Sequence, residues 1–471
     1  MDRRLLSYYD RELAYLRELG SEFAEEFPKA AGKLGLSATD CADPHVERLL
    51  EGFAFLTARV QLSMDAEFPR FTEHLLDMIY PHCLAPLPSM AVVSLQPNPR
   101  QVISRQGFTL PRGTTLRADV PDRTAVACRY RTAHDVTLWP IEISGLSHES
   151  GSGALEATAL RQLERGGRRV RSLLRLRLRS FDGRPISDLQ IERLPLFLRT
   201  QDALGRRLFE LCHTAALGVA IRRVSGSLLE LKSNDYLAPL GFEDDQALLP
   251  HGARSFQGYR LLEEYFALPD RFAFVELRGL ASGIARCSDS EVEILILLDR
   301  QDPELEAGLG IGHAQLFCTP VVNLFEHRAD RIQLSDRTNE YHVVPDRTRP
   351  GDFEVHSVVS VTGHGEKGTP PRSFEPFYAC TARTTNLADG GYFTVHRRQR
   401  AAPSRATGSR SGYRGSDTCL ALVDGNEGPY RPSLRQLSVE LLCSNRDLPL
   451  SLCSEGRAVH FQLDVSSPVL S

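Results

Sequence analysis

The sequence has little of what a metalloprotein, a secreted domain or a membrane protein requires. It holds ten cysteines, but none forms a Cys-x-x-Cys pair and no cysteine–histidine group has zinc-site spacing. The N-terminus lacks the apolar core of a signal peptide, and the longest aliphatic run, Ile294 to Leu298, is too short to cross a membrane. We therefore expect a soluble, cytoplasmic protein with reduced cysteines, no bound metal and no direct membrane insertion.

Net charge and tryptophan are also scarce. The formal net charge is −4, so bulk electrostatics gives no reason to expect nucleic acid as the main partner. Tryptophan occurs once in 471 residues, which is poor material for the aromatic platform of a carbohydrate-binding protein. Hydrophobic residues make up 42% and charged residues 25%, both ordinary for a globular chain with a large buried core.

The first ninety residues carry the periodicity of helices. A first helix is expected to end at Pro28, and a second to begin at Asp43-Pro44, an N-cap followed by a first-turn proline. A third, shorter helix is expected after Pro69. Apolar residues recur every three or four positions, which predicts one apolar stripe on each long helix: Leu6, Tyr9, Leu13, Leu16, Phe23 and Phe27 on the first, and Val46, Leu49, Phe53, Leu56 and Val60 on the second.

Two long helices and a short one make too small a core to cover these stripes. Later domains or another chain must cover the rest. We therefore treat part of the stripes as a candidate partner-binding surface, made of Leu13, Leu16, Phe23, Val46, Leu49, Phe53, Leu56 and Val60.

After about residue 91 the pattern changes to short β-prone runs separated by Gly, Pro, Asn and Asp. Few regular helices lie between these runs, which favours antiparallel sheets over βαβ units. The predicted fold is α+β and mostly β. Its expected parts are an N-terminal helical element at 1–90, a first antiparallel β-rich lobe at 91–300, a second at 301–471, and a mobile loop at 397–417.

Motifs of catalysis and cofactor binding are weak. The run Gly363 to Gly368 fits Gly-x-Gly-x-x-Gly, but Pro370 and Pro371 prevent the helix that a dinucleotide site needs, so a hairpin turn is expected there. The adjacent Glu263 and Glu264 cannot face each other as a glycosidase pair does. We therefore expect no enzymatic activity and no cofactor.

Two further groups of residues could carry a function. The neighbours His82-Cys83 and Cys212-His213 have no third catalytic group placed by the sequence. Arginines alternate with leucines from Leu174 to Arg179, which predicts a cationic face on one strand. Such a face could contact phosphate or form salt bridges with another chain, or it could simply be a solvated strand face. We favour the solvated face.

Many separate segments resemble the TssF (VasA/ImpG) family, baseplate subunits of the bacterial type VI secretion system. The similarity begins with Tyr-Tyr-Asp-Arg-Glu-Leu at residues 8–13 and continues into the β-rich part. The segments that carry it are Tyr8 to Leu13, Asp43 to Leu49, Glu51 to Arg59, Tyr80 to His82, Pro86 to Met90, Cys128 to Thr132, Gly258 to Phe266, Cys318 to Phe325 and Tyr341 to Asp346.

The resemblance implies a structural, non-enzymatic wedge component of the baseplate. Its implied partners are TssG, a second TssF copy, TssK and TssE. The resemblance also implies that the assembled baseplate surrounds the Hcp/VgrG spike and docks on the membrane complex at the inner face of the cytoplasmic membrane. The wedge would prime sheath assembly, and the N-terminal helices would join a bundle shared between subunits. TssF-like chains also continue into a C-terminal segment beyond the last residue of this one. The alternative is a β-rich carbohydrate-active or glycan-binding protein.

Overall fold

The chain forms two compact units, Met1–Leu84 and Ala85–Ser471. We call them the helical unit and the β unit. Their architecture is taken from a computed structural model, which describes residues 4–33, 43–120, 126–151, 163, 168–252, 256–335, 337–365, 370–377, 391–400, 411–424, 434–452, 459–464 and 467–469.

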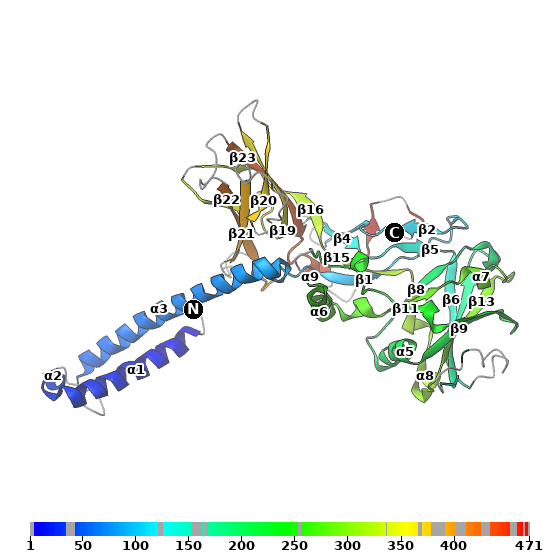
Figure 1. Ribbon diagram of the computed structural model, residues 1–471, viewed down its shortest axis with the longest axis horizontal. Helices are drawn as coiled ribbons and strands as arrows, with labels where there is room; N and C mark the ends of the chain where they lie inside the picture. Colours follow the sequence, from blue (N-terminus) through cyan, green and yellow to red (C-terminus); the bar gives the residue numbers. More distant parts are fainter. Residues whose placement is uncertain are drawn as a thin grey trace. The chain divides into compact units, whose positions relative to one another are not determined.

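The helical unit is built around an antiparallel helical hairpin (Figure 1). Its elements are α1 (Arg4–Glu26), α2 (Pro28–Lys33), α3 (Pro44–Ile79) and the 3-10 turn η1 (Pro81–Leu84). Two side-chain contacts fix the direction of the pair. The Tyr8 hydroxyl donates to the Asp65 carboxylate, and Arg17 Nη2 donates to Glu47 Oε1 at 3.0 Å. Residues early in α1 therefore meet residues late in α3.

The predicted helix boundaries at Pro28, Asp43 and Tyr80 are confirmed. The Asp43 carboxylate accepts the backbone N–H of His45 at 2.8 Å, as an N-cap should, and Pro44 occupies the first turn. The helix ends where the backbone N–H of Tyr80 bonds to the carbonyl of Leu76.

The predicted break at Pro69 is wrong, because α3 continues through it as one helix of 36 residues. A proline inside a helix loses one backbone hydrogen bond and costs about 3 kcal/mol. The rest of this long helix keeps its i→i−4 bonds, and together they outweigh that single loss. The expected third helix is therefore the last part of α3.

Most strands of the β unit belong to four sheets, and the mostly-β α+β fold is confirmed. Sheet 1 contains β6 (Ile141–Ser150), β7 (Ser172–Ser180), β9 (Ala216–Arg222), β10 (Leu228–Ser233) and β13 (Glu291–Leu298). Sheet 2 contains β8 (Arg193–Leu198), β11 (Leu237–Pro239), β12 (Phe274–Arg278) and β14 (Ala314–Leu316). Sheet 3 contains β1 (Met90–Ser94), β3 (Thr115–Ala118), β4 (Cys128–Thr132), β15 (Cys318–Val322) and β24 (Gln462–Leu463).

Sheet 4 is the largest of the four. Its strands are β16 (Phe325–Arg328), β17 (Ile332–Gln333), β18 (Glu340–Val343), β19 (Glu354–Gly365), β20 (Arg372–Pro376), β21 (Gly391–Gln399), β22 (Ser416–Asp424) and β23 (Leu434–Ser444). A separate pair joins β2 (Phe108–Leu110) to β5 (Val136–Leu138). Among the described strands only β20 with β21 is a parallel pair, which confirms the antiparallel prediction for the rest.

The sheets do not divide at residue 300, where we expected the two β lobes to part. After that point β14 pairs with β8, and β15 pairs with β1 and β4. Sheet 4 begins only at Phe325, and β24 returns the chain to sheet 3. Sequence patterns show where strands lie but not which strands pair, so the boundary was placed too early.

The predicted mobile loop at 397–417 is also partly strand. Arg397 to Gln399 belong to β21 and pair with Ser416 to Thr418 of β22. Arg397 Nη1 additionally donates to the carbonyl of Val355 at 2.8 Å. Strand pairing therefore orders both ends of this segment, and its middle, residues 401–410, lies outside the described residues.

The β unit also contains helices that we did not expect from the sequence, and the longest are α5 (Ala203–Thr214) and α6 (Gln257–Ala267). Three shorter ones are α7 (Ala281–Ile284), α8 (Pro303–Gly308) and α9 (Pro449–Leu452). A signal for α5 was present, because Asp202 caps it by accepting the N–H of Gly205, and Leu208 and Leu211 bury one face.

A buried amide pair joins sheet 3 to sheet 4. Asn323 lies between β15 and β16, and Asn445 follows β23, and both are completely buried. Asn323 Nδ2 donates to Asn445 Oδ1 at 2.9 Å and to the carbonyl of Arg129 at 2.7 Å. Asn323 Oδ1 accepts the N–H of Asn445 at 2.6 Å. These bonds hold together segments that lie more than a hundred residues apart in sequence.

The predicted arginine face lies on β7, and its charges are neutralised within sheet 1. Arg177 Nη2 donates to Glu293 Oε1 at 2.8 Å, and Arg222 Nε donates to Glu293 Oε2 at 2.6 Å. Arg175 pairs with Glu149 at 2.8 Å, and Arg179 pairs with Glu142. The arginines are therefore part of a cross-strand ladder rather than an open cationic stripe.

Glu293 is the buried centre of this ladder, with 1% of its side chain exposed. Burial alone would raise its pKa, but the hydrogen bonds from Arg177 and Arg222 outweigh burial and hold the pKa below the usual value of 4.5. Because the folded pKa is lowered, the ladder contributes its full stability above pH 4.5. It loses that stability as the pH falls through the folded pKa.

We predict that Glu293→Gln lowers the free energy of unfolding by about 3 kcal/mol, since it leaves buried Arg222 without its counter-charge. Urea titration at pH 7 measures this difference, which should shrink below pH 4.5. Glu142→Gln is the control, because its pair with Arg179 is exposed and should change stability by less than about 1 kcal/mol. Equal effects of the two substitutions would contradict the burial argument.

Candidate interaction surfaces

The inner face of the helical hairpin is made of small side chains. Ala54 and Ala58 of α3 are completely buried in the helical unit. Small residues allow two helices to approach closely. They also bury little apolar surface: Leu50 and Leu62 beside them are only half-buried, and the most exposed apolar side chains of α3 lie elsewhere.

Those larger side chains lie on the opposite side of α3. Leu49 is 73% exposed, Phe53 59%, Leu56 57% and Val60 58%. The spacing of four, three and four residues places them on one stripe of the helix. We call these four residues the α3 stripe. Single exposed apolar residues are common on protein surfaces, whereas four of them on one face of a helix form a continuous apolar patch.

The other predicted partner-binding residues are less exposed. Leu13, Leu16 and Val46 are half-buried, while Phe23 is 38% exposed and its ring lies 5.4 Å from that of Phe27. Half of the predicted set is therefore a coherent exposed stripe on α3. The residues with intermediate burial contribute to the hairpin itself.

A second candidate surface lies on α6, a helix whose exposed face is apolar and whose buried face is charged. Its outward residues Tyr259, Leu262 and Phe266 are spaced three and four apart and are 50%, 57% and 80% exposed. Its inward residues Arg260 and Glu264 are charged and almost completely buried. Helices at a protein surface usually have the reverse arrangement.

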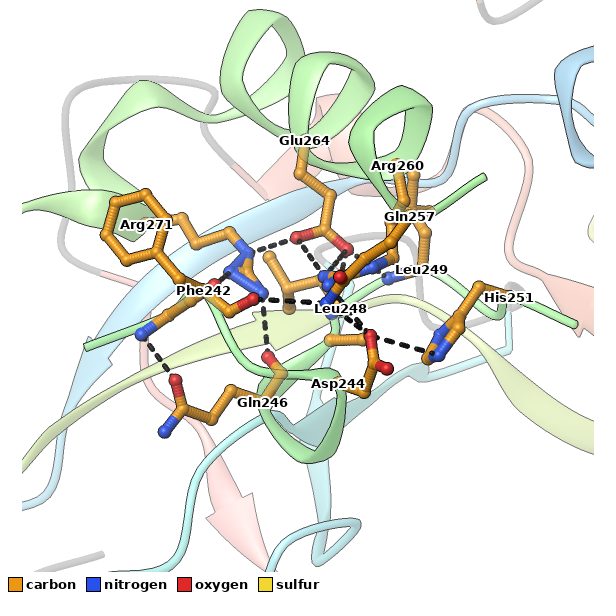
Figure 2. A network of polar contacts seen from close by, with 12 residues as sticks. Phe242, Asp244, Gln246, Leu248, Leu249, His251, Gln257, Arg260, Glu264 and Arg271 are labelled. Atoms are coloured by element: carbon orange, nitrogen blue, oxygen red, sulfur yellow. Dashed lines mark hydrogen bonds and ion pairs between the residues drawn. The ribbon is translucent and has the colours of Figure 1, made fainter. Parts of the chain in front are cut away.

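Figure 2 shows how the buried face of α6 is satisfied. Glu264 Oε1 accepts the backbone N–H groups of Leu248 and Leu249 at 3.0 and 2.9 Å. The same carboxylate pairs with Arg260 at 3.4 Å and with Nε of Arg271. A buried carboxylate needs such partners, because an unpaired charge in the interior is strongly unfavourable.

Arg271 extends the network to the loop before α6. Its Nη1 donates to the carbonyl of Gly241 and its Nη2 to that of Gln246, both at 2.7 Å. Burial lowers the pKa of Arg271 to about 10, although the neighbouring Glu264 opposes that shift. The guanidinium therefore stays charged at neutral pH and fixes the loop against α6.

His134 lies close to this network without joining it. Its ring packs edge-on against Phe274 at 5.5 Å, and neither ring nitrogen has a hydrogen-bond partner among the described residues. Burial, with the positive charges of Arg271 and Arg112, lowers the pKa of His134 to about 3. The imidazole is therefore neutral at physiological pH and serves as an apolar core residue.

The candidate catalytic residues do not form a catalytic arrangement. Glu264 is committed to the network beneath α6, while Glu263 lies on another side of the helix. Burial raises the pKa of Cys212 to about 12, which leaves its thiol unreactive, and the His213 ring packs at a tilt against Phe209 with the centroids 4.3 Å apart. His82 and Cys83 lie in the short turn η1.

The Gly-x-Gly-x-x-Gly run lies at the end of a β-hairpin. Gly363 and Gly365 close β19, which pairs antiparallel with β20 in a register that sets Gly363 opposite Arg372. This pairing agrees with the expected hairpin, whose turn at 366–369 lies outside the described residues. Within the described part of the chain, no cluster of three or more His, Cys, Asp or Glu side chains is placed to hold a metal ion.

A search of the described helices finds none that is long and apolar enough to span a membrane. Both α1 and α3 exceed 18 residues but carry charged side chains at short intervals.

Comparison with known families identifies the chain. It matches the family described as "Type VI secretion system, TssF" over residues 1–471. The chain belongs to the TssF family. This result confirms the resemblance found in the sequence, and the family is one of baseplate structural components rather than of carbohydrate-active proteins.

Individual relatives support the assignment. The chain is 48% identical to the type VI secretion system component TssF1 of Pseudomonas aeruginosa PAO1 over 472 residues, covering all of this chain and 75% of the relative. A cryo-electron microscopy structure of a TssK-TssF-TssG baseplate subcomplex is similar with a TM-score of 0.64 and 25% identity, covering 88% of this chain and 73% of the other. A baseplate complex from the same secretion system shares the fold, with a TM-score of 0.50 and 23% identity over 98% of this chain and 73% of that one.

We predict that Glu264→Gln destabilises this TssF chain by about 3 kcal/mol or more, because buried Arg271 loses its counter-charge and buried Arg260 keeps only its pair with Asp244. Chemical denaturation followed by circular dichroism measures the loss. Glu375→Gln, at an exposed carboxylate on β20, is the control and should cost less than about 1 kcal/mol. The network would not be stabilising if both variants unfolded at the wild-type denaturant concentration.

Proposed function

We propose that this chain is a structural, non-enzymatic subunit of the type VI secretion baseplate that assembles with TssG, TssK and a second TssF copy. The observation that carries the proposal is the exposed α3 stripe in a chain whose whole length matches the TssF family. Support for the partners comes from the similar cryo-electron microscopy structure, in which TssF is part of a TssK-TssF-TssG subcomplex. The site of action would be the cytoplasmic face of the inner membrane.

The role of the α3 stripe follows from the geometry of a two-helix hairpin. Each helix can bury only one face against its neighbour, and α3 uses the face of Ala54 and Ala58 for that contact. A third helix supplied by another subunit would cover Leu49, Phe53, Leu56 and Val60. Burying each Leu or Phe side chain is worth roughly 1.5–3 kcal/mol, so a covered stripe would stabilise the assembly substantially.

The experiment that tests this function is Leu49→Asp. Leu49 is exposed, so the isolated variant should keep the wild-type helical signal and melting transition by circular dichroism. In the assembly the new carboxylate would be buried without a partner, and co-purification with TssG or a second tagged copy should be lost.

Two further variants make the result specific. Arg59→Asp introduces the same carboxylate on α3 about a quarter turn away from the stripe and should assemble normally. Ala58→Asp places it on the inner face and should disturb the isolated hairpin itself. Wild-type recovery of the partners with Leu49→Asp would show that the stripe remains open to solvent, and this assembly role would then be wrong.

A further inference from the structure

The outer face of α6 is the second exposed apolar surface of the chain, and the baseplate role leaves it unassigned. Tyr259, Leu262 and Phe266 form its centre. Phe256 and Tyr265 extend it, with the ring of Phe256 5.6 Å from that of Tyr259 and the ring of Tyr265 5.6 Å from that of Phe266. We call these five residues the α6 face.

The α6 face is presented on a rigid support. The buried network of Glu264, Arg260 and Arg271 ties the inner side of the helix to the loop at 241–249 (Figure 2). A helix held in this way cannot rotate to bury Phe266 without leaving charges unpaired. The aromatic side chains therefore stay outside the core of the β unit.

The charges beside the α6 face indicate the chemistry of a partner that would fit it. Three consecutive acids, Glu243, Asp244 and Asp245, are exposed in the loop next to the helix. Asp244 is held against α6, because its Oδ1 accepts Gln257 Nε2 at 2.6 Å and lies 3.4 Å from both Arg260 and His251. Carboxylates beside exposed aromatic rings favour arginine, whose guanidinium pairs with carboxylates and stacks on aromatic faces.

A second copy of this chain does not fit the same surface. In a two-fold contact each residue patch meets its own copy. If the two α6 faces met in this way, the acidic loops would lie close together, and like charges across an interface oppose association.

We propose that the α6 face binds an apolar segment that carries arginine, supplied by another subunit of the baseplate. The apolar side chains of that segment cover Leu262 and Phe266, and its arginines lie against Tyr259 and the acidic loop at 243–245. The inference rests on the proposed function, which supplies the other subunits, and extends it by adding a contact site outside the helical unit.

The test uses the full chain and, as the probe, purified TssK and TssG of the same secretion system. Leu262→Ser with Phe266→Ser should weaken binding of one of these subunits by about tenfold or more, as loss of a central apolar anchor does. Glu243→Lys with Asp245→Lys should weaken the same subunit and reduce the salt dependence of binding. The serine variant should keep the wild-type melting temperature.

The matched controls are Val102→Ser and Glu375→Lys, and both should bind normally. Val102 is 92% exposed in another loop, and Glu375 lies on β20. Normal binding by the α6 variants would overturn the inference while leaving the baseplate role intact, since the wild-type chain would still bind. Failure of the wild-type chain to bind either subunit would overturn both. A lower melting temperature of the isolated serine variant would show that the α6 face is covered within the chain itself. A change in its self-association would show that a second copy covers the face. Either result would overturn the inference.

Discussion

The completely buried side chains of α3 in the helical hairpin are the small ones of Ala54 and Ala58, and the proposed assembly role of this chain depends on that packing. Ala54 and Ala58 use the single face that α3 can bury against α1, so the four residues of the α3 stripe have no place inside the unit. A hairpin of this kind is stable enough to form but is not complete. We therefore propose that another chain completes the helical part of this subunit.

The β unit follows a different rule, because it buries charge and polar groups wherever segments distant in sequence must be held together. The Asn323–Asn445 pair joins two sheets, Glu293 gathers the arginines of sheet 1, and Glu264 fixes α6 to its neighbouring loop. Each of these side chains has more than one polar partner, and buried polarity stabilises a single arrangement when it is paired in this way. Rigid placement of this kind suits a protein whose task is to hold other subunits in register.

Local sequence signals predicted local structure well. Asp43-Pro44 marked the start of α3, and runs such as Val292 to Leu298 became strands, because capping and β-propensity act within a few residues. The break at Pro69 failed because the cost of one missing hydrogen bond was smaller than the helix tendency around it. The boundary at residue 300 failed because strand pairing is non-local.

The candidate surfaces show the same contrast between local features, which the sequence predicts, and non-local packing, which it does not. Periodicity located the α3 stripe but could not tell which face α1 would cover, since Ala54 and Ala58 form a second, less conspicuous face. Nothing in the run Gly258 to Phe266 showed that its charged residues point inward; only the partners of Glu264 reveal this.

The proposal that another chain covers the α3 stripe is tested most directly by site-specific photo-crosslinking from position 53. With benzoylphenylalanine in place of Phe53, the chain co-expressed with its baseplate neighbours should form an adduct with a second subunit, whereas the same probe at exposed Arg59, about a quarter turn from the α3 stripe, should form far less of it. Absence of an intermolecular adduct from position 53 in the assembled complex would contradict the account.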